Sequence, residues 1–112
     1  VPPVEELTAM GVTVCCGSDG IRDAWSPLGN GDMLERAFLT AFRFDWNTEE
    51  NFRCALGCAT TQAARAIGLA DYGLHVGGRA DFVMIEAMNP GDALCLRPAI
   101  RRVVRRGIVV AG

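Results

Sequence analysis

The sequence has no lysine, a single histidine and no long apolar run. All 11 basic residues are arginine, and with 13 acidic residues they give a formal net charge of -2. This balance gives no broad electrostatic attraction to nucleic acid or to anionic lipid. No apolar segment approaches the ~20 residues that cross a bilayer, and no secretory signal opens the chain. We therefore expect a cytoplasmic protein that binds neither nucleic acid nor a membrane.

The cysteines lack the spacing of a metal site or a disulfide framework. They are five in number and form no C-x-x-C pair, which argues against both kinds of site. Cys54 and Cys58 lie four residues apart on a predicted helix and could face a metal together. Because apolar helical faces often carry cysteine, we interpret both as core residues.

Half of the 112 residues are apolar, which is enough for one small packed core. The first residue, Val1, is not an initiator methionine. We therefore expect a chain that was processed or cut from a longer polypeptide.

An apolar run at residues 12–16 ends at Gly17, Ser18 and a single carboxylate, Asp19. Such a run followed by a turn predicts a strand buried on both faces, as in parallel sheets. Asp19 then lies at the carboxyl end of the strand, where α/β proteins place their chemistry. The glycine-rich residues 17–31 predict a long loop at the same edge.

Four helices are predicted around this strand. The first spans residues 3–10 and stops at Gly11. Asp32, followed three residues later by Glu35, resembles a capping box for an amphipathic helix over residues 32–43. Thr48 caps the next helix, and a short alanine-rich helix ends at Gly68.

After Tyr72 the pattern of residues changes from helical periodicity to short apolar runs separated by glycines. Residues 81–85 predict a strand, residues 90–96 a short helical turn, and residues 100–105 and 108–110 two more strands. The first seventy residues offer no second strand to pair with residues 12–16. We infer the end of a larger α/β sheet or barrel, followed by a separate β layer.

Several segments carry a longer pattern. They are G-S-D-G-I-R-D-A-W-S-P-L-G at residues 17–29, D-M-L at 32–34, T-Q-A-A-R-A-I-G-L at 61–69, D-Y-G-L at 71–74, G-G-R-A-D-F-V-M-I at 77–85 and V-V-R-R-G-I-V-V at 103–110. Together they resemble the C-terminal part of the amidohydrolase superfamily. The loop with Asp23, Trp25 and Pro27 resembles the bacterial cytosine deaminase branch.

The resemblance implies an α/β fold. Residues 1–72 would hold the last strand and terminal helices of a (β/α)8 metal-dependent hydrolase barrel, and residues 73–112 strands of a small β-sandwich domain. It also implies one divalent metal ion, iron or zinc, at the barrel mouth. Asp19 aligns with the aspartate that binds this metal and exchanges protons with its water, and Trp25 with an aromatic wall of the substrate pocket.

The sequence departs from the cytosine deaminase pattern at two positions. Gly20 stands where these enzymes have a second aspartate, which would enlarge the substrate pocket, and Ser18 replaces a histidine. The H-x-H of the first strand is absent, since His75 is the only histidine. We therefore expect the chain alone to be inactive, with the remainder of a parent chain supplying the other ligands. The H-x-E and P-C-x-x-C signatures of zinc deaminases do not occur.

Two other functions stay open. The same scaffold could cleave a cyclic amide or another C–N bond, and a non-catalytic α/β interaction module would be complete at this length. Outside the loop, we expect His75 at the surface and the arginines of residues 101–106 on a solvated or salt-bridged strand face. Asp23 is expected to organise its turn. An aromatic group, comprising Phe38, Phe42, Phe44, Trp46 and Phe52, fits either helix packing or a subunit contact in a homo-oligomer.

Overall fold

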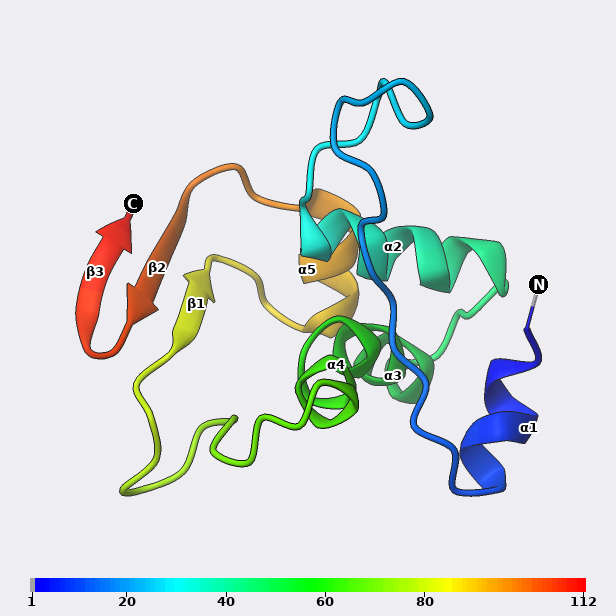
Figure 1. The fold of residues 1–112 in the computed structure, drawn as a ribbon, viewed down its shortest axis with the longest axis horizontal. Coiled ribbons are helices and arrows are strands. Elements are labelled where there is room, and N and C mark those ends of the chain that lie inside the picture. The colour runs from blue at the N-terminus through cyan, green and yellow to red at the C-terminus, as the bar shows by residue number, and fades with distance from the viewer. Residues whose placement is uncertain (1) are drawn as a thin grey trace.

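A computed structural model describes residues 2–112 and shows a helical layer beside a small sheet (Figure 1). The elements are α1 (Val4–Ala9), α2 (Met33–Arg43), α3 (Glu49–Ala59), α4 (Thr61–Ala66), β1 (Phe82–Ile85), α5 (Pro90–Leu96), β2 (Arg101–Arg105) and β3 (Ile108–Ala111). The segment before α2 projects beyond both layers as a loop (Figure 1). Within residues 2–112, no helix is long and apolar enough to span a membrane.

The helices begin at residues that satisfy their first free N–H groups. The Asp32 carboxylate accepts from Leu34 N at 3.0 Å and Glu35 N at 3.4 Å, and the Thr48 hydroxyl accepts from Asn51 N at 3.2 Å. The predicted capping box is only half formed, because the Asp32 N–H donates to Asn30 Oδ1 and not to Glu35. The predicted helical stops at Gly11 and Gly68 are confirmed, with φ values of 81° and 75°.

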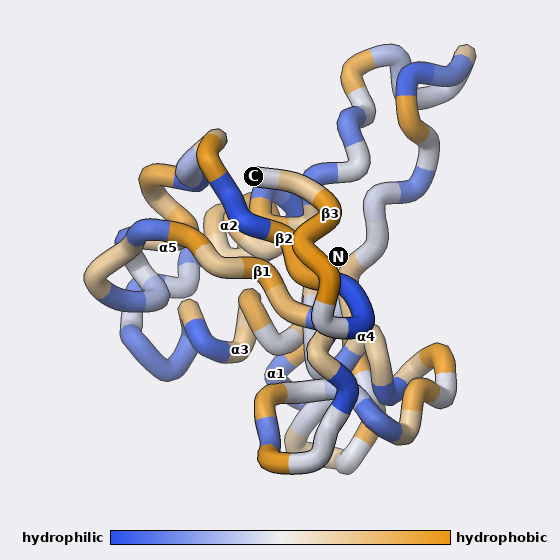
Figure 2. The backbone as a smooth tube through the Cα atoms, turned by 90° about the vertical axis from the view of Figure 1, so that its left-hand side faces the viewer, coloured by the Kyte–Doolittle hydropathy of each residue, from blue (hydrophilic) through white to orange (hydrophobic). Residues whose placement is uncertain are grey.

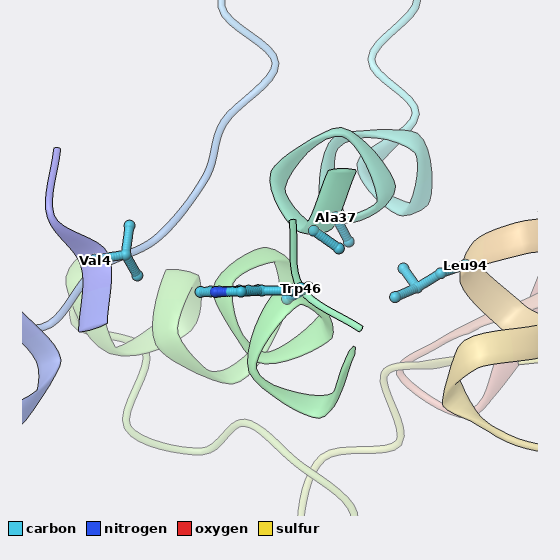
Figure 3. Packing of buried hydrophobic residues seen from close by; sticks show 6 residues of the cluster. Val4, Ala37, Trp46 and Leu94 are labelled. Atoms are coloured by element: carbon cyan, nitrogen blue, oxygen red, sulfur yellow. The ribbon is translucent and has the colours of Figure 1, made fainter. Parts of the chain in front are cut away.

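The core lies between the helices (Figure 3). Small residues, Ala37 and Ala41 of α2 and Ala55 of α3, let these helices approach closely, and Leu94 of α5 fills the space beside them. Trp46, which is 7% exposed, donates from Nε1 to Glu5 Oε1 at 2.8 Å and so ties α1 to the core.

The predicted aromatic group divides in the structure. Trp46 is buried, and Phe38, Phe44 and Phe52 are packed against the core. Phe42 is 74% exposed, although its ring lies 5.9 Å from that of Phe38. Helix packing is therefore confirmed for four of the five residues, and a subunit contact stays a prediction for Phe42.

The three strands form one antiparallel sheet in the order β1-β2-β3. Phe82 pairs with Val104 and Ile85 with Arg101. Arg106 and Gly107 connect β2 to β3 with φ values of 51° and 77°, as a tight hairpin turn requires. The tube is orange along β1 and β3 (Figure 2), because the residues of both strands are mostly apolar. These two strands are the outer ones of the sheet, so each has one unpaired edge within residues 2–112.

The strand predicted at residues 12–16 is wrong for this chain. Val12 N–H bonds back to Leu7 O in α1, and Cys16 N–H donates to Cys58 O at 3.0 Å. No strand runs beside this segment within residues 2–112, and Val12 is 46% exposed. The physical reason is that an extended segment becomes a strand only when another strand satisfies its backbone groups.

Candidate functional site

Asp19 lies on the exposed loop between residues 16 and 32. Its backbone adopts a left-handed conformation, with φ at 55°, which aspartate tolerates better than most residues. The side chain is exposed, and no hydrogen bond to its carboxylate is found within residues 2–112. The carboxylate is therefore free to bind a cation or a polar ligand.

The neighbouring Ser18 carries a polar atom without a protein partner. Its Oγ is buried and makes no hydrogen bond within the described chain. A buried hydroxyl normally has a partner, since leaving it unsatisfied costs about 1–3 kcal/mol. This hydroxyl lies next to Asp19 in sequence.

Asp19 fits one ligand of a metal, but the described residues do not form a whole metal site. A carboxylate oxygen is a suitable ligand for zinc or iron, and catalytic sites usually use three protein ligands. No group of three or more His, Cys, Asp or Glu side chains within residues 2–112 could hold a metal ion. Any further ligands must therefore come from outside these residues.

The Asp23 side chain forms a tight turn in the loop after Asp19. The Asp23 Oδ1 atom accepts from Trp25 N at 2.9 Å and Ser26 N at 2.7 Å. This arrangement confirms that Asp23 organises the turn, which is a common use of aspartate.

Two glycines of this loop, Gly20 and Gly29, lie where an added side chain would meet another part of the loop. A Cβ at Gly29 would collide with the carbonyl oxygen of Gly20, and a Cβ at Gly20 would collide with the Asp23 carboxylate. Gly29 therefore has to be glycine for the backbone to approach this closely, whereas a Cβ at Gly20 would require only the Asp23 side chain to move. The role predicted for Gly20 in enlarging a substrate pocket stays a prediction.

The tip of the loop presents uncovered apolar side chains. Trp25 is 94% exposed, Leu28 91% and Ile21 57%. Trp25 therefore does not fill the core of this chain, which leaves its indole face open for a flat ligand or for another part of a protein.

An ion pair fixes the end of the loop. Arg101 Nη1 donates to Asp32 Oδ1 at 2.7 Å, and Nη2 donates to Asp32 Oδ2 at 2.8 Å. The hydrogen bond from Arg101 lowers the pKa of the Asp32 carboxyl below its ordinary value. The salt-bridged interpretation is thus confirmed for Arg101, whereas Arg102, Arg105 and Arg106 are exposed.

Sequence reasoning missed this pair, because its members lie 69 residues apart. Asp32 is recognisable as a helix cap and Arg101 as the start of a strand. No local pattern indicates that the two meet.

Cys58 is buried in the helical layer and is not a reactive thiol. Cys58 is 3% exposed, and burial, together with nearby Cys54 and Cys16, raises its pKa to about 12. Such thiols stay protonated at neutral pH and are poor nucleophiles and ligands. The predicted core role is confirmed for Cys58, and Cys54 packs against the core partly buried.

His75 lies apart from the loop at the surface, as predicted. Its Nε2 atom lies 3.2 Å from Asp71 Oδ1, and its side chain is 55% exposed.

A separate groove of about 620 Å³ runs between the start of α4 and the sheet, with mostly apolar walls from residues such as Tyr72, Phe82 and Val104.

The profile of the Amidohydrolase family matches residues 1–111, and the chain belongs to this family. Its members are typically metal-dependent. The predicted superfamily is thereby confirmed.

Two curated relatives illustrate the range of the similarity. The chain is 33% identical to N-isopropylammelide isopropyl amidohydrolase of Pseudomonas sp. (strain ADP), over 97% of this chain and 29% of the relative. It is also 33% identical to 5'-deoxyadenosine deaminase of Methanoregula boonei, over 80% of this chain and 20% of the relative. The chain spans less than a third of the length of either protein.

The fold is also similar to a solved structure. Over 98% of this chain and 27% of the other, it matches 5-methylcytosine deaminase from Klebsiella pneumoniae liganded with 5-fluorocytosine, with a TM-score of 0.87 and 32% identity. The described residues are thus a mixed α/β segment that corresponds to part of an amidohydrolase structure.

Proposed function

We propose that this chain is the C-terminal part of a metal-dependent amidohydrolase that deaminates cytosine or a related nitrogen heterocycle and releases ammonia. The observation that carries the proposal is the match of nearly the whole chain to a 5-methylcytosine deaminase at a TM-score of 0.87. The chain alone is expected to be inactive, because residues 2–112 hold no complete metal site.

In this proposal the open features of the structure face the remainder of the parent chain. Residues 1–72 supply the last strand and terminal helices of the barrel, and residues 73–112 supply strands of a β-sandwich. Residues 12–16 then gain the neighbouring strands that they lack here. The unpaired edges of the sheet are covered in the same way.

Asp19 is the proposed catalytic residue and metal ligand. Its free, exposed carboxylate would bind iron or zinc together with ligands from elsewhere in the parent. When bound, such a metal would lower the pKa of a coordinated water and so provide a nucleophile near neutral pH. The Asp19 carboxylate can then accept a proton at one oxygen and return it to the leaving amine.

Trp25 and Gly20 are the proposed substrate-binding residues. The Trp25 indole is 94% exposed on a loop that Asp23 holds in shape. A flat indole suits stacking on a flat heterocycle. The role of Gly20 rests on the resemblance to cytosine deaminases, because the Asp23 carboxylate occupies the space that a Cβ at Gly20 would take in this structure.

A second candidate is an amidohydrolase that cleaves another C–N bond, such as that of a cyclic amide or an exocyclic alkylamine. The observation that favours it is the 33% identity to N-isopropylammelide isopropyl amidohydrolase over 97% of this chain. A non-catalytic interaction module is the third outcome, and it would show neither bound metal nor turnover.

The test uses the longest polypeptide that the gene encodes, purified with its metal. We expect about one equivalent of iron or zinc by mass spectrometry of the metal, and ammonia release from cytosine or 5-methylcytosine. Release of isopropylamine from N-isopropylammelide without ammonia release would support the second candidate. A folded protein without metal or turnover on either substrate would contradict both.

The decisive variant is Asp19→Ala. We expect loss of metal and a fall in kcat of about a hundredfold or more, since metal and proton transfer are both affected. Asp45→Ala is the matched control, because Asp45 is also exposed and also has a φ of 55°. Wild-type metal content in Asp19→Ala would remove Asp19 from the site.

A further inference from the structure

We propose that the Asp32–Arg101 pair is a clamp that positions the loop carrying Asp19 and Trp25, which makes Arg101 a positioning residue for the candidate site. The inference rests on the proposed function. It assigns to the small sheet a task in the site, since Arg101 is the first residue of β2.

The geometry of Arg101 leaves its side chain little freedom. Two guanidinium nitrogens donate to the two carboxylate oxygens of Asp32 at 2.7 and 2.8 Å. The third, Nε, donates to Pro98 O at 2.6 Å. Only 23% of the Arg101 side chain and 27% of the Asp32 side chain are exposed. Three hydrogen bonds from one planar guanidinium fix the orientation of the Arg101 side chain as well as its distance from Asp32.

Asp32 connects Arg101 to the end of the loop and to the start of α2. Its carboxylate caps α2, and its N–H donates to Asn30 Oδ1 at 2.9 Å. Asn30 Nδ2 in turn donates to Glu35 Oε2. The exit of the loop is therefore joined to the first turn of α2 and, through Arg101, to the sheet.

Contacts within the loop hold its parts together. Asp23 and the close approach of Gly20 to Gly29 shape its body. A Cβ at Gly31 would lie 2.9 Å from Ile21 Cδ1, so the entry and exit of the loop are in contact. A shift at Asp32 would consequently move the loop as a unit.

The clamp differs in place from what holds the helices together. The helical core rests on Ala37, Ala41, Ala55 and Leu94, whereas the ion pair joins the residue before α2 to the first residue of β2. Loss of the pair is therefore expected to free the loop while the helical layer stays packed.

The test measures hydrogen exchange and activity in the longest polypeptide that the gene encodes. The variants are Asp32→Asn, which keeps a good helix cap but loses the charge, and Arg101→Met. Arg101→Lys keeps the charge without the fork. Arg102→Met is the matched control, since Arg102 is the neighbouring, exposed arginine.

We expect peptides from residues 17–31 to exchange about tenfold faster in Asp32→Asn and Arg101→Met, and peptides from α3 and β3 to be unchanged. kcat/KM should fall about tenfold in the same variants, because small displacements of reacting groups are costly. Arg101→Lys should recover part of the loss. Arg102→Met should match wild type in both measurements.

Wild-type exchange of the loop in both clamp variants would overturn the inference, as would an equal increase in α2, α3 and the sheet, which indicates a purely structural role. The exchange measurement needs no substrate. A wild-type protein without amidohydrolase activity whose loop still loosens in the variants would therefore contradict the proposed function and support the clamp.

Discussion

The helical layer and the segment of residues 12–31 differ in where their backbone groups find partners. Helices α2 and α3 bond internally, begin at capping residues and bury small side chains against each other. Residues 12–16 are apolar as well, but among residues 2–112 their backbone hydrogen-bonds to other elements only at Val12 and Cys16. A helix can therefore satisfy most of its backbone groups within one segment, whereas a strand needs a second strand from another part of the protein.

Leu94→Ala should have the largest effect on the stability of the helical layer. Leu94 is 2% exposed and completes the core, so its truncation should lower the free energy of unfolding by about 2–5 kcal/mol. Urea titration of the intact protein measures this change. Leu96→Ala on the same helix is the control, since Leu96 is 66% exposed and should change stability by less than about 0.5 kcal/mol. Equal effects would mean that α5 does not close the core.

Thr48→Ala should have a smaller effect in the same region. It removes the hydroxyl that accepts from Asn51 N, which should lower the free energy of unfolding by about 1 kcal/mol. Thr48→Ser should retain most of the wild-type stability. If Thr48→Ser and Thr48→Ala were alike in urea titration, the cap would contribute nothing to α3.

The Asp32–Arg101 pair should make the link between the two regions sensitive to acid. The pKa of Asp32 is lowered from 3.8, chiefly by its hydrogen bond to Arg101. A lowered carboxyl pKa stabilises the fold at pH values above the ordinary one, and this contribution is lost as the pH falls through the lowered pKa. The melting temperature of wild type should therefore exceed that of Asp32→Asn near neutral pH, and the difference should shrink below about pH 4. A difference independent of pH would show that the charge of Asp32 is immaterial.

Gly29→Ala should have the smallest effect on global stability. Its Cβ would collide with the Gly20 carbonyl, so the loop must open. Because none of the described residues 17–31 belongs to the helical core or packs against it, the free energy of unfolding should change by less than about 0.5 kcal/mol. Hydrogen exchange of residues 17–31 should nevertheless rise. Gly17→Ala serves as the control, since nothing lies within 4 Å of a Cβ at that position. A large loss of stability in Gly29→Ala would mean that loop and helices fold as one unit.

Local signals sufficed for most of the secondary structure. Asp32 and Thr48 indicated where α2 and α3 begin, and the apolar runs at residues 100–105 and 108–110 indicated β2 and β3. These features depend on residues close in sequence, which explains why the pattern was informative. The strand at residues 12–16 was predicted wrongly because apolar character shows a preference for burial and does not show whether a partner exists.

The candidate site was only partly accessible to the same reasoning. Asp19 and Trp25 stood out as a carboxylate and an indole on a long loop, and their proposed roles depend on similarity to amidohydrolases. The close approach of the Gly20 and Gly29 backbones and the ion pair between Asp32 and Arg101 could not be predicted from local patterns.

Capping residues, periodicity and motifs act over short stretches of chain, so the order of amino acids was enough to indicate the helices, the hairpin and the family. The contact of Arg101 with Asp32 across 69 residues and the exposure of Trp25 became visible only in the folded chain. Ion pairs and burial depend on which distant segments meet, and the packing of all segments together sets those contacts.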